Sequence, residues 1–400
     1  MLFNTFSRSK LLVDDELKEV IETGHFDKVD TEMVEQLQRC RVIIDDTTDE
    51  FKKFTDLYNK RVYTPFEYEF TIIPTYDCNV ACYYCNHSNK TLSHELLQKL
   101  KVFFSKELEK SECQNVAVRI AGGEPLLHPE LVFDILEELS CITEEYGKNF
   151  FSALATNGTL LTKEVLERLS FLNAVQVTFE GCRSYHDHVR HDYTGTFDRA
   201  VTSAEMVLNA GIVLNVRVHV SQDSIPRMEE LFWFLHSSGI LGSHTMITAA
   251  PVVTTTICPL YPSKCTESEA ASLLPQAWEE AKKCGISLSG MPSPAYERLA
   301  CPYVTPTSLI VDPTGTIYTC LMAANEKTDA AGSLEKGFHS PISDVPDFRD
   351  TECEECQFLV LCGGYCTWRQ YQSEPGSCET RSLLAERVKL HLKSTYPLME

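Results

Sequence analysis

Three cysteines within eight residues constrain this chain more than any other part of its sequence. They are Cys78, Cys82 and Cys85, separated by three and then by two residues. A protein that holds a [4Fe–4S] cluster alone supplies four thiolates, so a set of three leaves one iron open to another ligand. A zinc site also needs a fourth ligand, and His87 follows two residues after Cys85. The spacing favours the cluster, with zinc as the alternative.

The sequence around the triplet alternates between strand-like and helix-like patterns. Residues 69–75 are rich in β-branched and aromatic side chains and predict a strand that ends just before Cys78. Later strands are expected at 115–121, 150–156, 174–180, 212–220 and 245–250, with helices at 93–109, 130–145, 163–169, 197–209 and 227–237. This order predicts an α/β fold with parallel strands. The cysteines then lie at the carboxyl end of a strand, where such enzymes keep their chemistry.

The second strand is followed by Gly122, Gly123 and Glu124. Two glycines let the backbone approach a ligand closely because no Cβ intervenes. The neighbouring carboxylate can pair with an ammonium group. Alone, this motif is a weak signal that also fits a plain turn.

Polar residues also mark the next three strands. Asn157 begins an Asn-Gly turn after the third strand. Thr178 and Glu180 close the fourth strand, and a carboxylate there can accept hydrogen bonds from ribose hydroxyls. Residues 181–190 contain two histidines but favour a polar loop over a metal site. Arg217 lies inside an apolar strand, which is costly unless the charge is paired. It is expected to bind either a ligand carboxylate or a carboxylate inside the barrel.

Seven further cysteines follow in the last hundred residues. They are Cys301, Cys320, Cys353, Cys356, Cys362, Cys366 and Cys378. A zinc ribbon would use the CxxC pair but would leave five thiols unexplained. Metal binding is the natural role for so many cysteines in a chain with no sign of secretion.

Together these motifs resemble the radical S-adenosylmethionine (radical SAM) superfamily, over about residues 66–380. The family signature is CxxxCxxC with an aromatic or apolar residue, here Tyr84, before the last cysteine. The resemblance implies a partial (β/α)6 barrel whose cluster binds SAM through its amino and carboxylate groups. One electron from the cluster then cleaves SAM to a 5′-deoxyadenosyl radical, which removes a hydrogen atom from the substrate.

The same resemblance implies contacts to SAM. Gly122, Gly123 and Glu124 correspond to the family's site for the amino group, Asn157 lies in the polar loop beside SAM, and Arg217 is the candidate for the SAM carboxylate. Thr178 and Glu180 stand where the family often has Ser and Asp, which leaves their role plausible and their geometry open.

The C-terminal cysteines, together with Gly315, resemble the SPASM extension of radical SAM enzymes, which holds two auxiliary [4Fe–4S] clusters and brings the expected total to three. The outer cluster is assigned to Cys353, Cys356, Cys362 and Cys378, and the inner one to Cys301, Cys320 and Cys366. The fourth ligand of the inner cluster is open: Cys258, Cys265 or Cys284 is a candidate, or one iron takes a substrate thiolate.

The expected domains are an N-terminal module at 1–65, the barrel at 66–250, a bridging region at 251–300 and the SPASM domain at 301–400. The module has helix patterns at 14–23, 31–41 and 49–61 and a strand candidate at 42–44, an α+β set that resembles a truncated winged helix. Such a module holds the leader of a peptide substrate by β-strand addition, or it is a cap packed on the barrel. Residues 267–283 and 379–392 predict two further helices.

SPASM enzymes mostly act on peptides or protein side chains. In sulfatase-maturing relatives, an Asp that acts as a base follows the cysteine matching Cys320; here it is Leu321. A crosslink, thioether or carbon–carbon, in a ribosomally made precursor peptide is therefore favoured. The alternatives are sulfatase-maturase-like side-chain oxidation, epimerisation with Cys182 as hydrogen donor, or a non-catalytic iron–sulfur electron carrier. A flavodoxin or ferredoxin is the expected reductant.

Composition bears on whether the chain is a membrane, secreted or nucleic-acid-binding protein. The chain has 400 residues, of which 43% are hydrophobic, but no apolar run reaches the ~18–20 residues of a membrane span. The N-terminus lacks the charged start of a signal peptide, so a cytoplasmic protein is expected. The net charge of −21 argues against a nucleic-acid partner, because phosphates would be repelled.

Overall fold

A parallel sheet of six consecutive strands organises the chain. The computed structural model describes residues 1–400 except 64, 86–87, 191–194, 253–266, 289–304, 325–329, 340–352, 364–383, 387, 390–391 and 393–400. The strands are β3 (Glu67–Ile72), β4 (Asn115–Ile120), β5 (Asn149–Thr156), β6 (Ala174–Phe179), β7 (Val213–Val220) and β8 (Thr245–Pro251), adjacent in sequence order. All five pairings are parallel. The predicted α/β fold with six barrel strands is confirmed.

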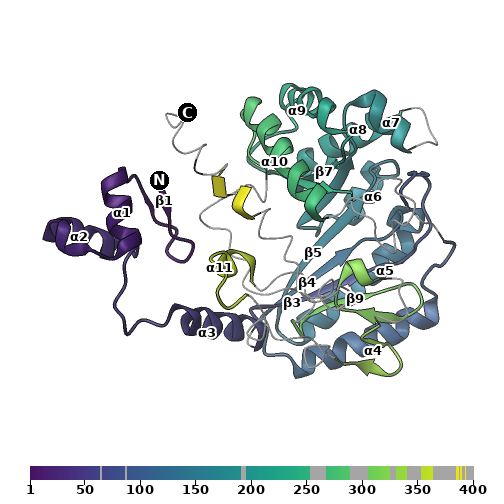
Figure 1. Ribbon diagram of the computed structural model, residues 1–400. Helices are drawn as coiled ribbons and strands as arrows, with labels where there is room; N and C mark the ends of the chain where they lie inside the picture. Colours follow the sequence, from purple (N-terminus) through teal and green to yellow (C-terminus); the bar gives the residue numbers. More distant parts are fainter. Residues whose placement is uncertain are drawn as a thin grey trace.

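Helices connect these strands and cover one face of the sheet (Figure 1). They are α4 (His94–Lys110), α5 (Pro129–Glu145), α6 (Lys163–Arg168), α8 (Thr196–Asn209), α9 (Met228–Ser237) and α10 (Glu267–Lys283), all close to the predicted ranges. Alternate strand residues face the helices: Val116, Val118 and Ile120 of β4 are buried in the main core. Burying side chains of this size stabilises the fold by about 1.5–3 kcal/mol each. The residues between them line the opposite, concave face.

Residues after 301 extend the same sheet. Strand β9 (Ser308–Val311) pairs in parallel with β3, so it joins the edge of the barrel. Three short strands, β10 (Thr316–Tyr318), β11 (Gly332–Ser333) and β12 (Gly337–Phe338), follow in antiparallel order. The turn between β9 and β10 uses Gly315 at φ +78°, where an L side chain is strained. This hairpin brings Cys320 and the η5 turn (Leu321–Ala323) toward the barrel strands.

The N-terminal module contains α1 (Asp15–Thr23), α2 (Thr31–Arg39) and α3 (Glu50–Tyr63), as the periodicity predicts. In Figure 1, α1 and α2 lie apart from the sheet and α3 leads to it. The predicted strand at 42–44 is wrong, because the N–H groups of Val42 and Ile43 fold back to the carbonyl of Leu37. An antiparallel pair, β1 (Leu2–Phe3) and β2 (Lys10–Leu11), forms instead.

The predicted polar loop at 181–190 is also wrong. Residues Arg183–Arg190 form helix α7, with His186, Val189 and Arg190 buried on one face. Their spacing of three and four is helical, but two of these residues are polar, so an apolar pattern does not reveal them. The short elements η1 (Phe26–Lys28), η2 (Pro125–Leu127), η3 (Ile225–Arg227) and α11 (Leu359–Cys362) complete the described fold.

Most of the predicted helix at 379–392 lies outside the described residues. Within the described ranges, every helix is too short or too polar to traverse a lipid bilayer.

Candidate active site

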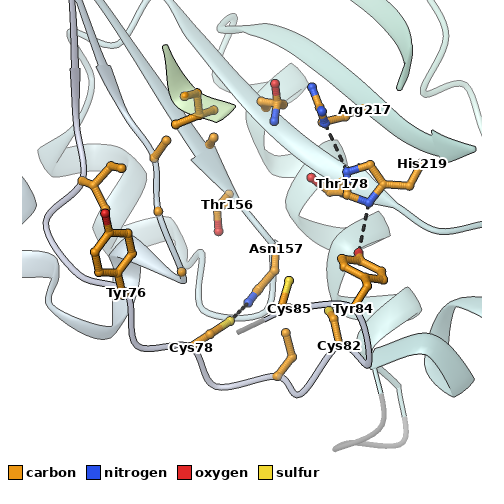
Figure 2. A pocket seen from close by; sticks show the side chains of 18 of the residues that line it. Tyr76, Cys78, Cys82, Tyr84, Cys85, Thr156, Asn157, Thr178, Arg217 and His219 are labelled. Atoms are coloured by element: carbon orange, nitrogen blue, oxygen red, sulfur yellow. Dashed lines mark hydrogen bonds between the residues drawn. The ribbon is translucent and has the colours of Figure 1, made fainter. Parts of the chain in front are cut away.

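A cavity of about 290 Å³ opens on the concave face at the carboxyl ends of the strands. Figure 2 shows the three cysteines along a loop at one edge, with His219 between Arg217 and Tyr84. Its lining comes from strands β3 to β7, the cysteine loop, helix α7 and the segment after β10. The lining includes Cys78, Cys82, Tyr84, Cys85, Gly122, Gly123, Asn157, Thr178, Arg190, Arg217, His219 and Leu321. Many residues predicted from separate motifs therefore share one cavity.

The cysteine loop packs directly on the two glycines after β4. The N–H of Gly123 donates to the Thr75 carbonyl at 3.0 Å, and that of Glu124 donates to the Asp77 carbonyl at 2.8 Å. A Cβ on Gly123 would lie 2.1 Å from the Asp77 oxygen, and one on Gly122 would lie 2.5 Å from the Thr75 oxygen. The sequence motif suggests close approach of a ligand, but the closest neighbour of these glycines is the chain's own backbone.

Glu124 fastens the same loop to the next strand. Its carboxylate accepts hydrogen bonds from the Thr156 hydroxyl at 2.8 Å and from the Asn157 N–H at 2.7 Å. The side chain is fully buried, and burial raises the pKa of its carboxyl group. Glu124 is absent from the described cavity lining, so its predicted contact with an ammonium group stays a prediction.

Asn157 reaches from β5 to the cysteine loop. Its Nδ2 lies 3.7 Å from the Cys78 sulfur and donates to Asn79 Oδ1 at 2.9 Å. Its Oδ1 accepts from the N–H and the hydroxyl of Thr159, which fixes the amide orientation. The structure thus places Asn157 beside the first cysteine.

Glu180 is the centre of a buried polar cluster. Its carboxylate accepts from the Tyr84 hydroxyl at 2.6 Å and pairs with His219 Nδ1 at 3.1 Å and Arg190 Nη2 at 3.3 Å. Burial raises the pKa of Glu180, but His219, Arg190 and Tyr84 outweigh burial and hold the pKa far below its ordinary value. The carboxylate predicted at the end of this strand is therefore hydrogen-bonded to, or ion-paired with, side chains of the protein.

Arg190 is a site residue that the sequence did not single out. Its guanidinium donates to the carbonyls of Asn157 and Thr178, and its own carbonyl accepts from the Ala81 N–H at 3.3 Å. It therefore joins β5, β6 and the cysteine loop. The helical spacing of His186, Val189 and Arg190 was the signal that could have found it.

Arg217 and His219 continue the cluster toward the open cavity. The Arg217 Nε donates to His219 Nε2 at 3.2 Å, and His219 Nδ1 lies 3.1 Å from a Glu180 carboxylate oxygen. Thr178 lines the cavity between these strands. The predicted contacts of Arg217 and Thr178 with SAM stay predictions.

The donor set fits an iron–sulfur cluster. Burial raises the pKa of the Cys78 thiol to about 11, while a hydrogen bond with Cys85 lowers that of Cys82 against the effect of burial. A coordinated metal removes such protons. No three His, Cys, Asp or Glu side chains among the described residues are placed to share one metal ion. A [4Fe–4S] cluster does not require three side chains around one metal ion, because each thiolate binds a different iron.

Comparison with known proteins agrees with this geometry. Residues 72–221 match the family model of the radical SAM superfamily. The chain contains a radical SAM domain. This domain spans β4 to β7 and the cysteine loop, and such a domain implies one [4Fe–4S] cluster and SAM.

Relatives and solved structures extend the likeness beyond the radical SAM domain. Mycofactocin maturase MftC of Mycobacterium tuberculosis is 26% identical over 321 residues, covering 76% of each chain. An AdoMet-dependent heme synthase of Oleidesulfovibrio alaskensis is 21% identical over 72% of this chain and 80% of that one. These matches indicate an enzyme of the radical SAM type.

Among solved structures, anSMEcpe with bound AdoMet and the Cp18Cys peptide gives a TM-score of 0.63 at 18% identity, covering 83% of this chain and 97% of that one. Streptococcus suis SuiB bound to the precursor peptide SuiA gives 0.54 at 16% identity, covering 90% and 86%. At such identities the structures show the shared fold.

The C-terminal cysteines are only partly described. Cys353 and Cys356 lie in one turn, in which the Cys356 N–H donates to the Cys353 carbonyl, and Cys362 ends the short helix α11 that follows. Cys320 packs against a small apolar cluster whose members Ile73 and Tyr76 also line the cavity. Cys284 is buried against α9, with its sulfur 3.9 Å from the Glu229 carbonyl. Cys258, Cys265, Cys301, Cys366 and Cys378 lie outside the described residues.

Replacing Gly123 with Ala is expected to disrupt the seat of the cysteine loop, because the new Cβ would overlap the Asp77 backbone. We expect a loss of about 2–4 kcal/mol in the free energy of unfolding. Gly242→Ala is the matched control, since its Cβ would meet no atom within 4 Å. Equal urea midpoints for the two variants would contradict this packing.

Glu180→Gln is expected to leave Arg190 buried without its carboxylate, at a cost of about 3–5 kcal/mol at pH 7. Because the folded pKa of Glu180 is depressed, its stabilising effect is present above the ordinary value of 4.5 and is lost as the pH falls below it. The stability gap between wild type and variant should therefore narrow below about pH 4.5.

Urea unfolding of the apoprotein at several pH values measures this gap. Glu130→Gln is the control, because Glu130 forms an exposed pair with Arg168 and its loss should cost less than about 1 kcal/mol. A gap for Glu180→Gln that stays constant to pH 3 would refute the assignment.

Proposed function

We propose that this radical SAM enzyme modifies a ribosomally made precursor peptide in the cytoplasm and installs an oxidative crosslink, thioether or carbon–carbon. Its cluster would be held by Cys78, Cys82 and Cys85. When bound, the cluster and SAM supply a 5′-deoxyadenosyl radical that removes a hydrogen atom from the substrate. Peptide maturation is supported by the likeness to MftC and by the peptide-bound SuiB and anSMEcpe structures.

The position of Leu321 carries the choice of a crosslink. Leu321 lines the same cavity as the three cysteines and is 44% exposed. It stands where sulfatase-maturing relatives are expected to place a basic carboxylate. The described lining of the cavity includes no Asp or Glu at all. Oxidation of a Ser or Cys side chain with a carboxylate base is therefore disfavoured.

The position of Cys182 disfavours epimerisation. Cys182 is buried, its sulfur lies 3.7 Å from the Ser184 hydroxyl, and it is absent from the described cavity lining. A hydrogen donor must reach the substrate radical, and Cys182 does not face the cavity where that radical would form.

The N-terminal module, residues 1–65, is proposed to bind the leader of the peptide. The β1–β2 pair offers a sheet edge to which an extended segment can add. The module also contacts the C-terminal cysteine segment: the Thr5 hydroxyl donates to the Gln357 carbonyl at 2.8 Å, and Phe3 packs near Phe358. A leader held there would lie close to the proposed auxiliary centres.

Two auxiliary [4Fe–4S] clusters are proposed in a SPASM domain at 301–400, joined to the barrel (66–250) by a bridging region at 251–300. The turn that holds Cys353 and Cys356, followed by Cys362 at the end of α11, supports the outer cluster. Cys320 beside the cavity supports an inner cluster that accepts the electron left on the substrate. A flavodoxin or ferredoxin is the proposed reductant.

Anaerobically reconstituted wild type should contain about twelve irons per chain, three clusters of four. The triple variant Cys78→Ala, Cys82→Ala, Cys85→Ala should lose about four irons and all SAM cleavage. The double variant Cys353→Ala, Cys356→Ala should lose about four irons and keep SAM cleavage. Iron, sulfide and 5′-deoxyadenosine assays measure these quantities, and zinc at one or two per chain would contradict the proposal.

A crosslink removes two hydrogen atoms, so the product peptide should be about 2 Da lighter than the precursor. The test substrates are the peptides of any short open reading frames that flank the gene, with dithionite as reductant and mass spectrometry as the readout. A product of unchanged mass that gains deuterium from D2O would indicate epimerisation instead. Precursor treated with the triple cysteine variant is the control.

A further inference from the structure

Below the rim of the cavity, the concave face carries an arginine that forms no ion pair with a carboxylate of the described residues. Arg119 of β4 lines the cavity, and its Nη2 donates to Gln176 Oε1 at 3.2 Å. Among the described residues, no Asp or Glu oxygen lies within 4 Å of its guanidinium. The carboxylate of Glu69 acts from a greater distance and raises the pKa of Arg119. The Arg119 side chain is exposed in the open cavity, and partial desolvation by the surrounding walls lowers its pKa.

Gln176 is oriented by its neighbours. Its Oε1 also accepts from Asn215 Nδ2 at 3.4 Å, and Asn215 Oδ1 accepts from the Thr248 hydroxyl at 3.1 Å. With Oε1 used twice, the Gln176 amide group carries its two N–H donors on the other side, where no described residue accepts them. Arg119 and Gln176 therefore both present spare donors to the cavity.

Small residues on the strand between them leave the space open. Arg119 and Gln176 lie on β4 and β6, and β5 passes between with Ala153 and Ala155. Ala155 is part of the cavity lining. A larger side chain at either alanine would fill the space across which Arg119 reaches Gln176.

The pair lies deeper than the residues assigned to the cofactor. Gln176 precedes Thr178 by two residues and Arg119 precedes Gly122 by three, which places them roughly 7–10 Å from the rim at the rise of a strand. A ligand chelated to an iron held by Cys78, Cys82 and Cys85 would bind beside these cysteines, which lie at the rim. The deeper donors are therefore available to the second reactant.

We propose that Arg119 and Gln176 form a carboxylate-binding subsite that holds the substrate peptide beside the residue to be modified. Guanidinium and amide donors match the two oxygens of a carboxylate, and no carboxylate of the described residues forms an ion pair with Arg119. The carboxylate is an acidic side chain or the peptide's C-terminus. This inference rests on the proposed function, because it needs a peptide in the cavity.

The test uses the reconstituted, SAM-bound enzyme immobilised under anaerobic conditions. Four pools of random decapeptides are applied: with or without Asp and Glu, each with a free or an amidated C-terminus. Wild type should retain pools that carry a carboxylate about tenfold more than the acid-free amidated pool. The pool that loses retention on amidation, or on removal of Asp and Glu, identifies the source of the carboxylate.

Variants distinguish loss of this subsite from loss of folding. Arg119→Gln should abolish the preference, and Gln176→Glu should do so as well, because the new carboxylate would pair with Arg119. Arg119→Lys should keep part of the preference. Arg168→Gln removes one exposed arginine that pairs with Glu130 and is absent from the cavity lining, so it should leave the preference unchanged. Iron content and thermal midpoint confirm that each variant is folded.

Each outcome decides one question. Retention of all four pools equally by wild type, or an undiminished preference in Arg119→Gln, would overturn the subsite while leaving peptide maturation intact. A loss of SAM affinity in Arg119→Gln would also overturn it and would assign Arg119 to the cofactor. If wild type retains no pool although it binds SAM, the proposed function fails and the subsite fails with it.

Discussion

A buried carboxylate, Glu180, holds the cavity together. It faces Arg190 and His219 in a region with almost no solvent, where an unpaired charge of either sign is costly. Arg190 in turn binds the carbonyls of two strands and accepts from the cysteine loop. The position of the loop that carries Cys82 therefore depends on electrostatic balance in the core as much as on local turns.

Glycine has a complementary role on the other side of the loop. Gly122 and Gly123 allow backbone to lie against backbone, and Glu124 then locks that contact to β5 through Thr156. The two sides position the loop from its beginning and from its end. The cysteine loop is therefore positioned by contacts of the protein itself, as a binding site on a rigid support requires.

The fold could be predicted from the sequence where periodicity is strong. The six barrel strands and most of the helices have apolar residues at regular spacing. Helix α7 was missed because two of its buried residues, His186 and Arg190, are polar and are stabilised only by tertiary partners. The strand at 42–44 was predicted because β-branched residues favour sheets, but a strand also needs a partner edge.

The site was predictable as a set of residues but not as a set of contacts. The cysteines, Asn157, Thr178 and Arg217 do meet in one cavity. The sequence did not indicate that Glu124 and Glu180 turn toward the protein, or that Arg119 faces open space without an acidic partner. These contacts depend on which strands are neighbours in the barrel, and no local sequence pattern encodes the distances between strands.

The pairing of β9 with β3 has a consequence for synthesis of the protein. The outer edge of β3, which includes Glu69, is covered only when β9, which begins at Ser308, has been made. This edge of the barrel is therefore exposed for most of translation. Exposed edges favour aggregation. A chaperone that shields the nascent edge would therefore act before the last quarter of the chain is made.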